Sequence, residues 1–427
     1  MMKNKLIDRK MGRALFLLCW LVYFTSYLGR LNYSSVMSSI IEEKILTFSQ
    51  AGTISMVYFF AYGIGQLCNG ILGDKLKPQN MIFMGLLCSG IANLLMGMVK
   101  AFPVMAVLWG INGYMQSMIW PPIIRIFAEK YTDEKKRKYS VDIASSMAVG
   151  TLMSYFLSAC AMHFFSWHAA FYLAAGILTI VAVVWIAGYV KVEEFQKKSS
   201  EYQTERQERT GAVLKEKETA LRGNEYKEPF VPLLLSSGLL GIVLPVMIHG
   251  ILKDGVTQWV PTYIYDCFDV TASFSVIVTM FLPLINLTGA YMARFAGKKN
   301  PEKEVRTSAY FFGIAVTALV CLLVFGRYQV FLAVILFAVI TASMMAVNTL
   351  YVNMIPLHFE SQGRVSTVSG FLNSVAYLGS ALSTFTIGVM VEKAGWIVTM
   401  AGWIGITGVG FLVCVFMRNK KFDNNGL

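Results

Sequence analysis

Twelve long apolar stretches constrain the fold of this 427-residue chain more than any other feature of its sequence. Each is close to the roughly 20 residues that a helix needs to cross the hydrocarbon core of a bilayer. They lie at residues 14–36, 50–72, 80–99, 103–127, 140–163, 167–190, 232–264, 273–296, 305–326, 330–355, 364–391 and 394–417. Because lipid cannot satisfy unpaired backbone groups, spanning segments of this kind are helical. The sequence therefore predicts an all-α polytopic membrane protein.

Composition supports this class and excludes several others. Hydrophobic residues make up 56% of the chain, charged residues make up 15%, and the mean hydropathy is +0.56. A soluble domain would carry about 25% charged residues. The sequence contains no P-loop, no catalytic-triad pattern and no metal-ligand spacing. We therefore expect neither an enzyme nor an ATP-driven pump, and we expect no cofactor and no bound metal.

The net charge of +12 would suggest nucleic-acid binding in a soluble protein, but its distribution indicates orientation instead. Basic residues gather at the amino terminus, in the loops after the second, fourth and eighth stretches, in the central segment and in the carboxyl tail. By the positive-inside rule these segments face the cytoplasm. We expect a multi-pass protein of the cell (cytoplasmic) membrane with both termini cytoplasmic, surrounded by the lipid bilayer and without a nucleic-acid partner.

One long polar stretch divides the chain into two halves of six spans. The sixth span of each half opens with a tryptophan, Trp167 or Trp396. Two related halves around a central site are typical of secondary transporters, which work by alternating access. The expected organisation is a cytoplasmic amino terminus (1–13), a first six-helix bundle (14–190), a charged and partly helical linker (191–231), a second six-helix bundle (232–417) and a cytoplasmic tail (418–427).

The cytoplasmic end of the second span carries the segment Gly70-Ile71-Leu72-Gly73-Asp74-Lys75. This segment resembles the loop motif between the second and third helices of the major facilitator superfamily, and the resemblance implies the major facilitator fold. Asp74 and Lys75 are expected to gate movement between the halves. Arg125 and Asp142, near the cytoplasmic ends of their spans, are predicted to be further gating or anchoring residues.

Two basic residues, Arg30 and Lys253, lie midway along the first and seventh spans, at related positions in the two halves. A charge at mid-bilayer costs about 2.5–3.5 kcal/mol and is rarely kept without a function. A pair of cations between the halves would bind an anion, with the arginine gripping it by a planar fork. The alternative is that each cation forms a fixed ion pair. Asp254 is one candidate partner, although its side chain would point about 100° away from that of Lys253 on a regular helix.

Segments in both halves are similar to the organophosphate:phosphate antiporter family, whose familiar members carry glycerol 3-phosphate and hexose phosphates. The resemblance implies that Arg30 is a phosphate-binding arginine, that Lys253 replaces a second one, and that Tyr23, Tyr27, Tyr62 and Trp120 line the pocket. The similar segments are Tyr27-Leu28-Gly29-Arg30-Leu31-Asn32, Ala61-Tyr62-Gly63, Gln116, Trp120-Pro121-Pro122, Arg125, Trp167-His168-Ala169-Ala170-Phe171-Tyr172, Lys253-Asp254-Gly255, Trp259-Val260-Pro261-Thr262-Tyr263, Gly370-Phe371 and Tyr377-Leu378-Gly379-Ser380.

Other pocket positions depart from the glycerol-phosphate type of that family. Leu31, Gln66 and Met147 stand where that type has two lysines and a histidine, and the eighth span lacks its acid. We therefore expect a substrate that is less highly charged, or differently shaped, than a simple phosphate monoester. Asn373 and Tyr377 lie one turn apart on the eleventh span. They are predicted either to face the pocket or to make hydrogen bonds between helices.

These patterns predict a secondary active transporter, expected to be monomeric, that moves a small organic anion. The preferred hypothesis is exchange of a phosphorylated metabolite for inorganic phosphate. A proton-coupled symporter of a sugar acid or other carboxylate would instead need a titratable carboxylate in the cavity. A membrane sensor would need a cytoplasmic signalling module. A drug/proton antiporter would carry an early fourth-span arginine, and 108–120 contains none.

Overall fold

The computed structural model describes residues 9–72, 76–131, 142–209, 237–299, 303–359 and 365–419, with a few isolated positions between them. Within these ranges the chain forms helices and no strand. The first half consists of α1 (Arg9–Glu42), α2 (Phe48–Leu72), α3 (Pro78–Met96), α4 (Phe102–Ser117), α5 (Trp120–Lys130), α7 (Ala144–Phe164) and α8 (Trp167–Arg209). The second half consists of α10 (Leu239–Gly250), the π-helix η1 (Ile251–Val256), α11 (Thr257–Phe268), α12 (Ala272–Thr279), α13 (Leu282–Lys299), α14 (Glu304–Phe325), α15 (Val330–Asn348), the π-helix η2 (Thr349–Met354), the short 3₁₀ helix η3 (Ile355–Phe359) and α16 (Val365–Phe416).

Ten helices of the described chain are long and apolar enough to cross a membrane. The remaining two of the twelve predicted crossings follow from local breaks. Gly395, with φ 75° and ψ 178°, divides α16 into two crossings, a conformation that suits a residue without a Cβ. The crossing predicted at 103–127 is two helices, α4 and α5, because Pro121 and Pro122 in the first turn of α5 have no N–H to continue the hydrogen-bond ladder from the end of α4.

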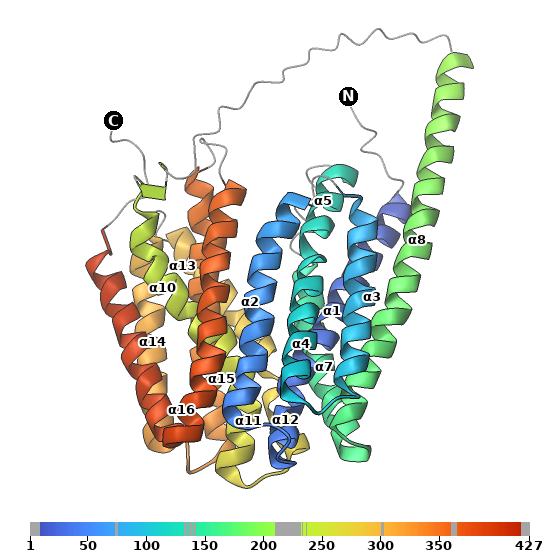
Figure 1. Ribbon diagram of the computed structural model, residues 1–427. Coiled ribbons are helices and arrows are strands. Elements are labelled where there is room, and N and C mark those ends of the chain that lie inside the picture. Colours follow the sequence, from blue (N-terminus) through green and yellow to red (C-terminus); the bar gives the residue numbers. More distant parts are fainter. Residues whose placement is uncertain are drawn as a thin grey trace.

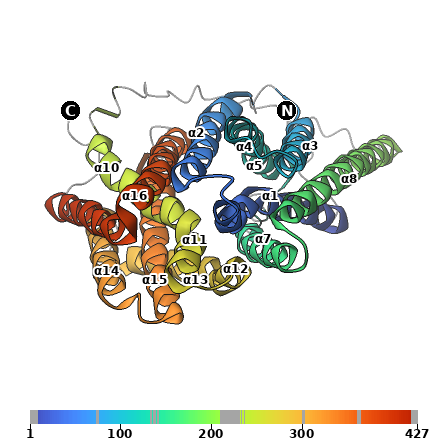
Figure 2. The same cartoon turned by 60° about the horizontal axis from the view of Figure 1, so that its bottom comes forward.

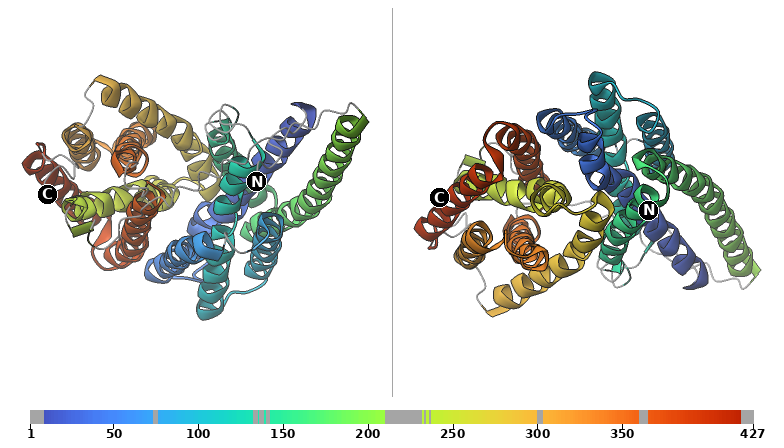
Figure 3. Two further views of the ribbon diagram at one scale, coloured as in Figure 1. Left: turned by 90° about the horizontal axis from the view of Figure 1, so that it is seen from above. Right: turned by 90° about the horizontal axis from the view of Figure 1, so that it is seen from below.

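The helices form two bundles of six crossings, one from α1 to α8 and one from α10 to α16 (Figures 1 and 2). Viewed from either end, the two bundles lie side by side (Figure 3). The all-α, twelve-span fold with two six-helix bundles expected from the sequence is confirmed. In the seventh crossing α10 begins at Leu239, and α8 continues past residue 190 to Arg209, so the segment expected as a partly helical linker begins within a helix. The polar residues after the sixth span prolong that helix beyond the others (Figure 1).

The first and second halves meet mainly along α2 and the first part of α16. We call the side on which α1 begins the terminal face, and the side on which α2 begins and α16 bends at Gly395 the distal face. Near the distal face, a Cβ added to Gly52 would lie 2.4 Å from the carbonyl oxygen of Thr384, and one added to Gly388 would lie 2.4 Å from that of Phe48. The two backbones therefore touch there in a way that only glycine permits.

Polar contacts also join the two halves near the distal face. The backbone N–H of Ser49 donates to Glu392 Oε2 at 2.8 Å, and Gln258 Nε2 donates to Ser55 Oγ at 3.4 Å. The contact between the halves continues inward to Gly63, where an added Cβ would lie 3.5 Å from the Cβ of Tyr377. Nearer the terminal face, a Cβ added to Gly370 would have no other heavy atom within 4 Å. The halves are thus closed together from the distal face to about mid-depth.

Candidate functional site

The mid-depth layer between the halves contains Arg30, which α1 presents toward a group of aromatic rings. Its Cζ atom lies 4.9 Å from the ring centroid of Tyr62, with four further rings within 6 Å. These are Tyr27 at 5.6 Å and Tyr58, Phe59 and Tyr377 at 5.9 Å. Four of the rings come from the first half and Tyr377 from the second. Ring faces attract a guanidinium electrostatically without neutralising its charge. Within the described residues the structure records no ion pair for Arg30, so the group keeps its charge available for an anion.

Three predicted pocket residues extend this aromatic wall toward the terminal face. The ring centroids of Tyr23 and Tyr27 are 5.4 Å apart in an edge-to-face arrangement, and those of Tyr23 and Trp120 are 4.7 Å apart. Trp120 opens α5 directly after the break that follows α4, so the break places this side chain in the wall. The structure therefore brings Tyr23, Tyr27 and Trp120 together with Arg30.

A buried amide network holds the backbone beside Arg30 and was not expected from the sequence. The carbonyl oxygen of Gly29 accepts hydrogen bonds from Asn112 Nδ2 at 2.8 Å and from Asn93 Nδ2 at 3.2 Å. Asn32 Nδ2 donates to Asn93 Oδ1 at 2.7 Å, and Ser89 Oγ donates to Asn112 Oδ1 at 2.5 Å. Buried polar groups of this kind fix geometry because each loses free energy if left unpaired. We call this set of residues the Gly29 clamp.

The second half presents Lys253 from η1, where a π-helical turn interrupts the α10–α11 crossing. Lys253 Nζ lies 3.1 Å from Asp254 Oδ2, and each side chain is 20% exposed. The adjacent carboxylate, expected to point away from Lys253, thus forms the ion pair that was the alternative interpretation. The wider π turn has fewer degrees of rotation per residue than a regular α-helix, which brings neighbouring side chains closer together.

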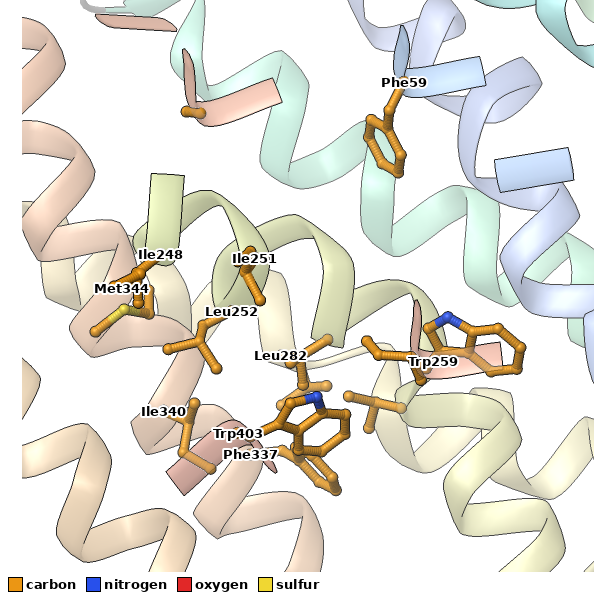
Figure 4. Packing of buried hydrophobic residues seen from close by; sticks show 14 of the residues in the cluster. Phe59, Ile248, Ile251, Leu252, Trp259, Leu282, Phe337, Ile340, Met344 and Trp403 are labelled. Carbon is orange, nitrogen blue, oxygen red and sulfur yellow. The ribbon is translucent and has the colours of Figure 1, made fainter. Parts of the chain in front are cut away.

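Tight packing against α16 fixes this pair. Ser380 Oγ lies 3.3 Å from Asp254 Oδ2 and 3.1 Å from the carbonyl oxygen of Gly250, to which it donates. A Cβ added to Gly250 would lie 2.1 Å from the carbonyl oxygen of Ala376. Apolar side chains of this crossing pack against α15, and Figure 4 shows Ile248 and Leu252 with Met344 and Ile340 there. Lys253 and Asp254 therefore occupy the remaining, polar side of an otherwise buried helix.

Other predicted residues surround this centre with less direct roles. Gln66 lies one turn beyond Tyr62 on α2, and Asn373 lies one turn before Tyr377 on α16, both half-buried. The ring centroids of Tyr62 and Tyr377 are 5.0 Å apart across the two halves. Met147, also half-buried, lies near the start of α7 and accepts a hydrogen bond from Thr151 Oγ1 through its backbone oxygen at 2.8 Å. We call Arg30, Lys253, Asp254 and the rings around Arg30 the central site.

Behind Lys253, a histidine side chain pairs with an asparagine side chain. His249 is fully buried, and its Nε2 atom lies 3.1 Å from Asn348 Oδ1 on α15. Across the described ranges, no group of three or more His, Cys, Asp or Glu side chains is placed to hold a metal ion.

The predicted gating residues are only partly described. Asp74 and Lys75 lie outside the described residues. Arg125 binds Glu129 Oε1 through Nε at 2.8 Å and donates from Nη1 to the backbone oxygen of Leu76 at 2.9 Å, so it anchors the segment that follows the motif. Asp142 stands just before α7, and its backbone oxygen accepts from Ser145 Oγ at 2.6 Å. These contacts are local to the first half.

Comparison with known proteins agrees with this architecture. The family model described as Major Facilitator Superfamily matches residues 19–384. A probable hexose phosphate transport protein of Chlamydia trachomatis is 23% identical over 403 residues, which cover 90% of this chain and 85% of that protein. The membrane sensor protein UhpC of Escherichia coli is 23% identical over 402 residues, covering 90% of this chain and 87% of that protein.

Solved structures share the fold at lower sequence identity. A bacterial homologue of the human lysosomal transporter Spinster, in an inward-facing and unoccupied conformation, has a TM-score of 0.77 at 12% identity, covering 98% of this chain and all of that chain. These structures show the fold alone, whereas the sequence relatives confirm the expected resemblance to phosphorylated-metabolite transporters of this superfamily.

Proposed function

Because this chain belongs to the major facilitator superfamily, we propose that it is a secondary transporter that carries a small organic anion, in the first place a phosphorylated metabolite, by alternating access. The observation that carries the proposal is Arg30, a cation without an ion pair in the described residues, held between the halves by five aromatic rings. Its planar fork suits a phosphate or carboxylate.

The arrangement of the halves supports a transport cycle. They are closed from the distal face to about the depth of Tyr377, which places the central site at the inner end of the closed region. If the basic loops face the cytoplasm, as the positive-inside rule requires, this conformation opens inward. An anion bound by Arg30 and by the second half would draw the halves together on the terminal side. Release of the distal contacts would then expose the anion to the other side of the membrane.

Exchange for inorganic phosphate follows from the same electrostatics. An empty site with an uncompensated cation reorients poorly, because Arg30 would have to be buried on all sides without a counter-charge. A bound anion removes this penalty, and inorganic phosphate can serve on the return journey. Similarity to a probable hexose phosphate transport protein supports the phosphorylated substrate in this scheme.

Counterflow in proteoliposomes tests the proposal. Vesicles loaded with phosphate should take up radiolabelled glucose 6-phosphate, and Arg30→Ala should abolish that uptake. Arg13→Ala is the matched control, since Arg13 lies on the same helix with an exposed side chain and should leave uptake unchanged. Equal uptake by the Arg30→Ala and wild-type proteins would refute the site assignment.

Asp254 favours a second candidate, a proton-coupled symporter of a sugar acid or other carboxylate. The sequence interpretation required a titratable carboxylate in the cavity for this function, and Asp254 is a partly exposed carboxylate at mid-depth. Uptake of a sugar acid into phosphate-free vesicles, driven by an imposed pH gradient, would identify it. Similarity to a membrane sensor protein supports sensing as a third hypothesis. A sensor would bind the ligand without transporting it.

A further inference from the structure

The charges of the central site do not cancel. Arg30 and Lys253 are cations, and Asp254 is a carboxylate that lies 3.1 Å from Lys253. Among the described residues, these are the charged side chains at mid-depth of the spans. His249 is buried against the neutral side chain of Asn348 and contributes no fixed charge. The site therefore carries one net positive charge, although it contains two cations.

Asp254 cannot easily move out of the site. Ser380 lies 3.3 Å from its Oδ2 atom, and the neighbouring Gly255 packs so closely that an added Cβ would lie 2.3 Å from Ser383 Oγ. The pair is thus clamped between its own helical turn and α16. A substrate that reaches Lys253 meets the charge of Asp254 at the same time.

The groups that face Asp254 come from each element packed around it. Lys253 and His249 belong to its own crossing, and Arg30 of α1 interacts with it electrostatically. Tyr377 and Ser380 face it from α16. On α15, Asn348 reaches the same region through His249, and the described residues of that helix carry no charged side chain. Asp254 is therefore the one negative charge among these groups.

We propose that Asp254 is a specificity-determining residue that limits the transported anion to a single negative charge. The proposal rests on the organic-anion transport proposed above. A doubly charged head group would place its second charge beside the carboxylate in a poorly screened site, where like charges repel strongly. A singly charged head group balances the site. The substrate class is a small monoanion whose body lies against the aromatic wall.

Phosphate and sulfate esters of the same sugar separate the effect of the head-group charge from the effect of the sugar. A phosphate monoester carries a charge between −1 and −2, because its second pKa is about 6. A sulfate ester stays singly charged throughout. Isothermal titration calorimetry of the purified full chain should compare glucose 6-phosphate with glucose 6-sulfate at pH 5.5 and pH 7.5. The phosphate ester should bind roughly 20-fold more tightly at pH 5.5, in proportion to its singly charged fraction. The affinity for the sulfate ester should change less than about twofold.

Three variants assign the effect to Asp254. Asp254→Asn keeps an oxygen for Ser380 but removes the charge. In this variant the phosphate ester should bind less than about threefold more tightly at pH 5.5 than at pH 7.5; we call this ratio of affinities the pH ratio. The double variant Lys253→Gln/Asp254→Asn restores one net positive charge and should restore the preference for the singly charged ester. Asp269→Asn is the control. It removes an exposed carboxylate after α11, at a left-handed residue (φ 51°) that asparagine accepts, and should behave as wild type.

Two results would overturn the proposal. One is a sulfate-ester affinity that rises in acid as steeply as that of the phosphate ester, since the proton would then bind Asp254 rather than the substrate. The other is a pH ratio for the phosphate ester that is the same in Asp254→Asn and in the double variant as in the wild-type protein. If the wild-type protein and Arg30→Ala bind both esters equally, or neither binds them, the proposed function itself fails and this inference falls with it.

Discussion

The two halves of the protein hold their central cations in opposite ways. In the first half, the backbone beside Arg30 is fixed by the Gly29 clamp, and its guanidinium lies among aromatic rings without an ion pair in the described residues. In the second half, Lys253 stands on a π-helical turn and pairs with Asp254. Under the proposed function, the first half would thus supply an anion site that exists before the substrate binds. In the second half, a substrate that bridges the two would have to share Lys253 with Asp254, which α16 holds in place.

Charge-preserving exchanges should expose this asymmetry with the largest effect. Arg30→Lys keeps the charge but loses the planar fork, and a lost charge-assisted hydrogen bond costs about 1.5–3 kcal/mol, or roughly 10- to 150-fold in affinity. Lys253→Arg should change affinity less than about threefold, because the longer fork still reaches both Asp254 and a bound anion. The measurement is the affinity for glucose 6-phosphate at pH 5.5, with initial counterflow rates alongside.

Equal losses in these two variants would break the comparison. They would mean that both cations grip the substrate alike and that the ion pair in the second half opens completely. A greater loss in Lys253→Arg than in Arg30→Lys would reverse the roles of the halves.

The Gly29 clamp provides the next largest expected effect. Asn112→Leu leaves the hydroxyl of Ser89 with one partner fewer and removes the shorter of the two bonds to the Gly29 carbonyl oxygen. Unpaired buried groups cost about 1–3 kcal/mol. We expect roughly tenfold weaker anion binding and a lower unfolding temperature of the purified protein.

Asn348→Leu is the matched comparison in the second half. It removes a half-buried asparagine behind Lys253 that bonds a side chain, that of His249, rather than the backbone of the cation-bearing helix. A similar loss of thermal stability with less than about threefold loss of binding would place the positioning role in the first half. Equal binding losses in both variants would remove that distinction.

Much of this architecture could be predicted from sequence, because lipid imposes a simple rule on helix length and charge. The two central cations were found in this way, since an intramembrane charge is rare enough to stand out. The pairing of Lys253 with Asp254 was not, because the argument assumed a regular helix and a π turn leaves no clear pattern in Ile251–Val256. Gly250 and Gly255, which allow α16 to pack against this turn, were the available signal.

The Gly29 clamp was not predicted from the sequence, for a different reason. Asn32, Asn93 and Asn112 each look like ordinary inter-helix polar residues. Nothing in their spacing reveals that Asn93 and Asn112 share the Gly29 carbonyl oxygen and that Asn32 bonds to Asn93. Convergence of α1, α3 and α4 is a tertiary property. The distal contact of Glu392 was likewise hidden, because its partner is a backbone N–H 343 residues away.

The contact between Glu392 and Ser49 gives the smallest predicted effect, and it tests what holds the two halves together at the distal face. Glu392 accepts from the backbone N–H of Ser49 at 2.8 Å, in the first turn of α2, where a negative charge is stabilised by about 0.3–1 kcal/mol. Glu392→Gln should therefore shift the equilibrium toward the distally open state roughly two- to fivefold. The readout is the rate at which a membrane-impermeant thiol reagent labels a cysteine at Ser55, which is buried under Gln258 in this conformation, with the native cysteines replaced.

Lys393→Gln is the control for that shift, because it changes an exposed charge at the adjacent position, for which the structure records no hydrogen bond or ion pair with the described residues of α2. Its labelling rate should match that of the parent protein. If Glu392→Gln labels no faster than Lys393→Gln, the distal closure is maintained by the close backbone packing at Gly52 and Gly388 alone. The closure would then respond to the size of those two residues and not to charge. Because glycine permits that contact in both halves, the distal face would be the one region in which the halves behave alike.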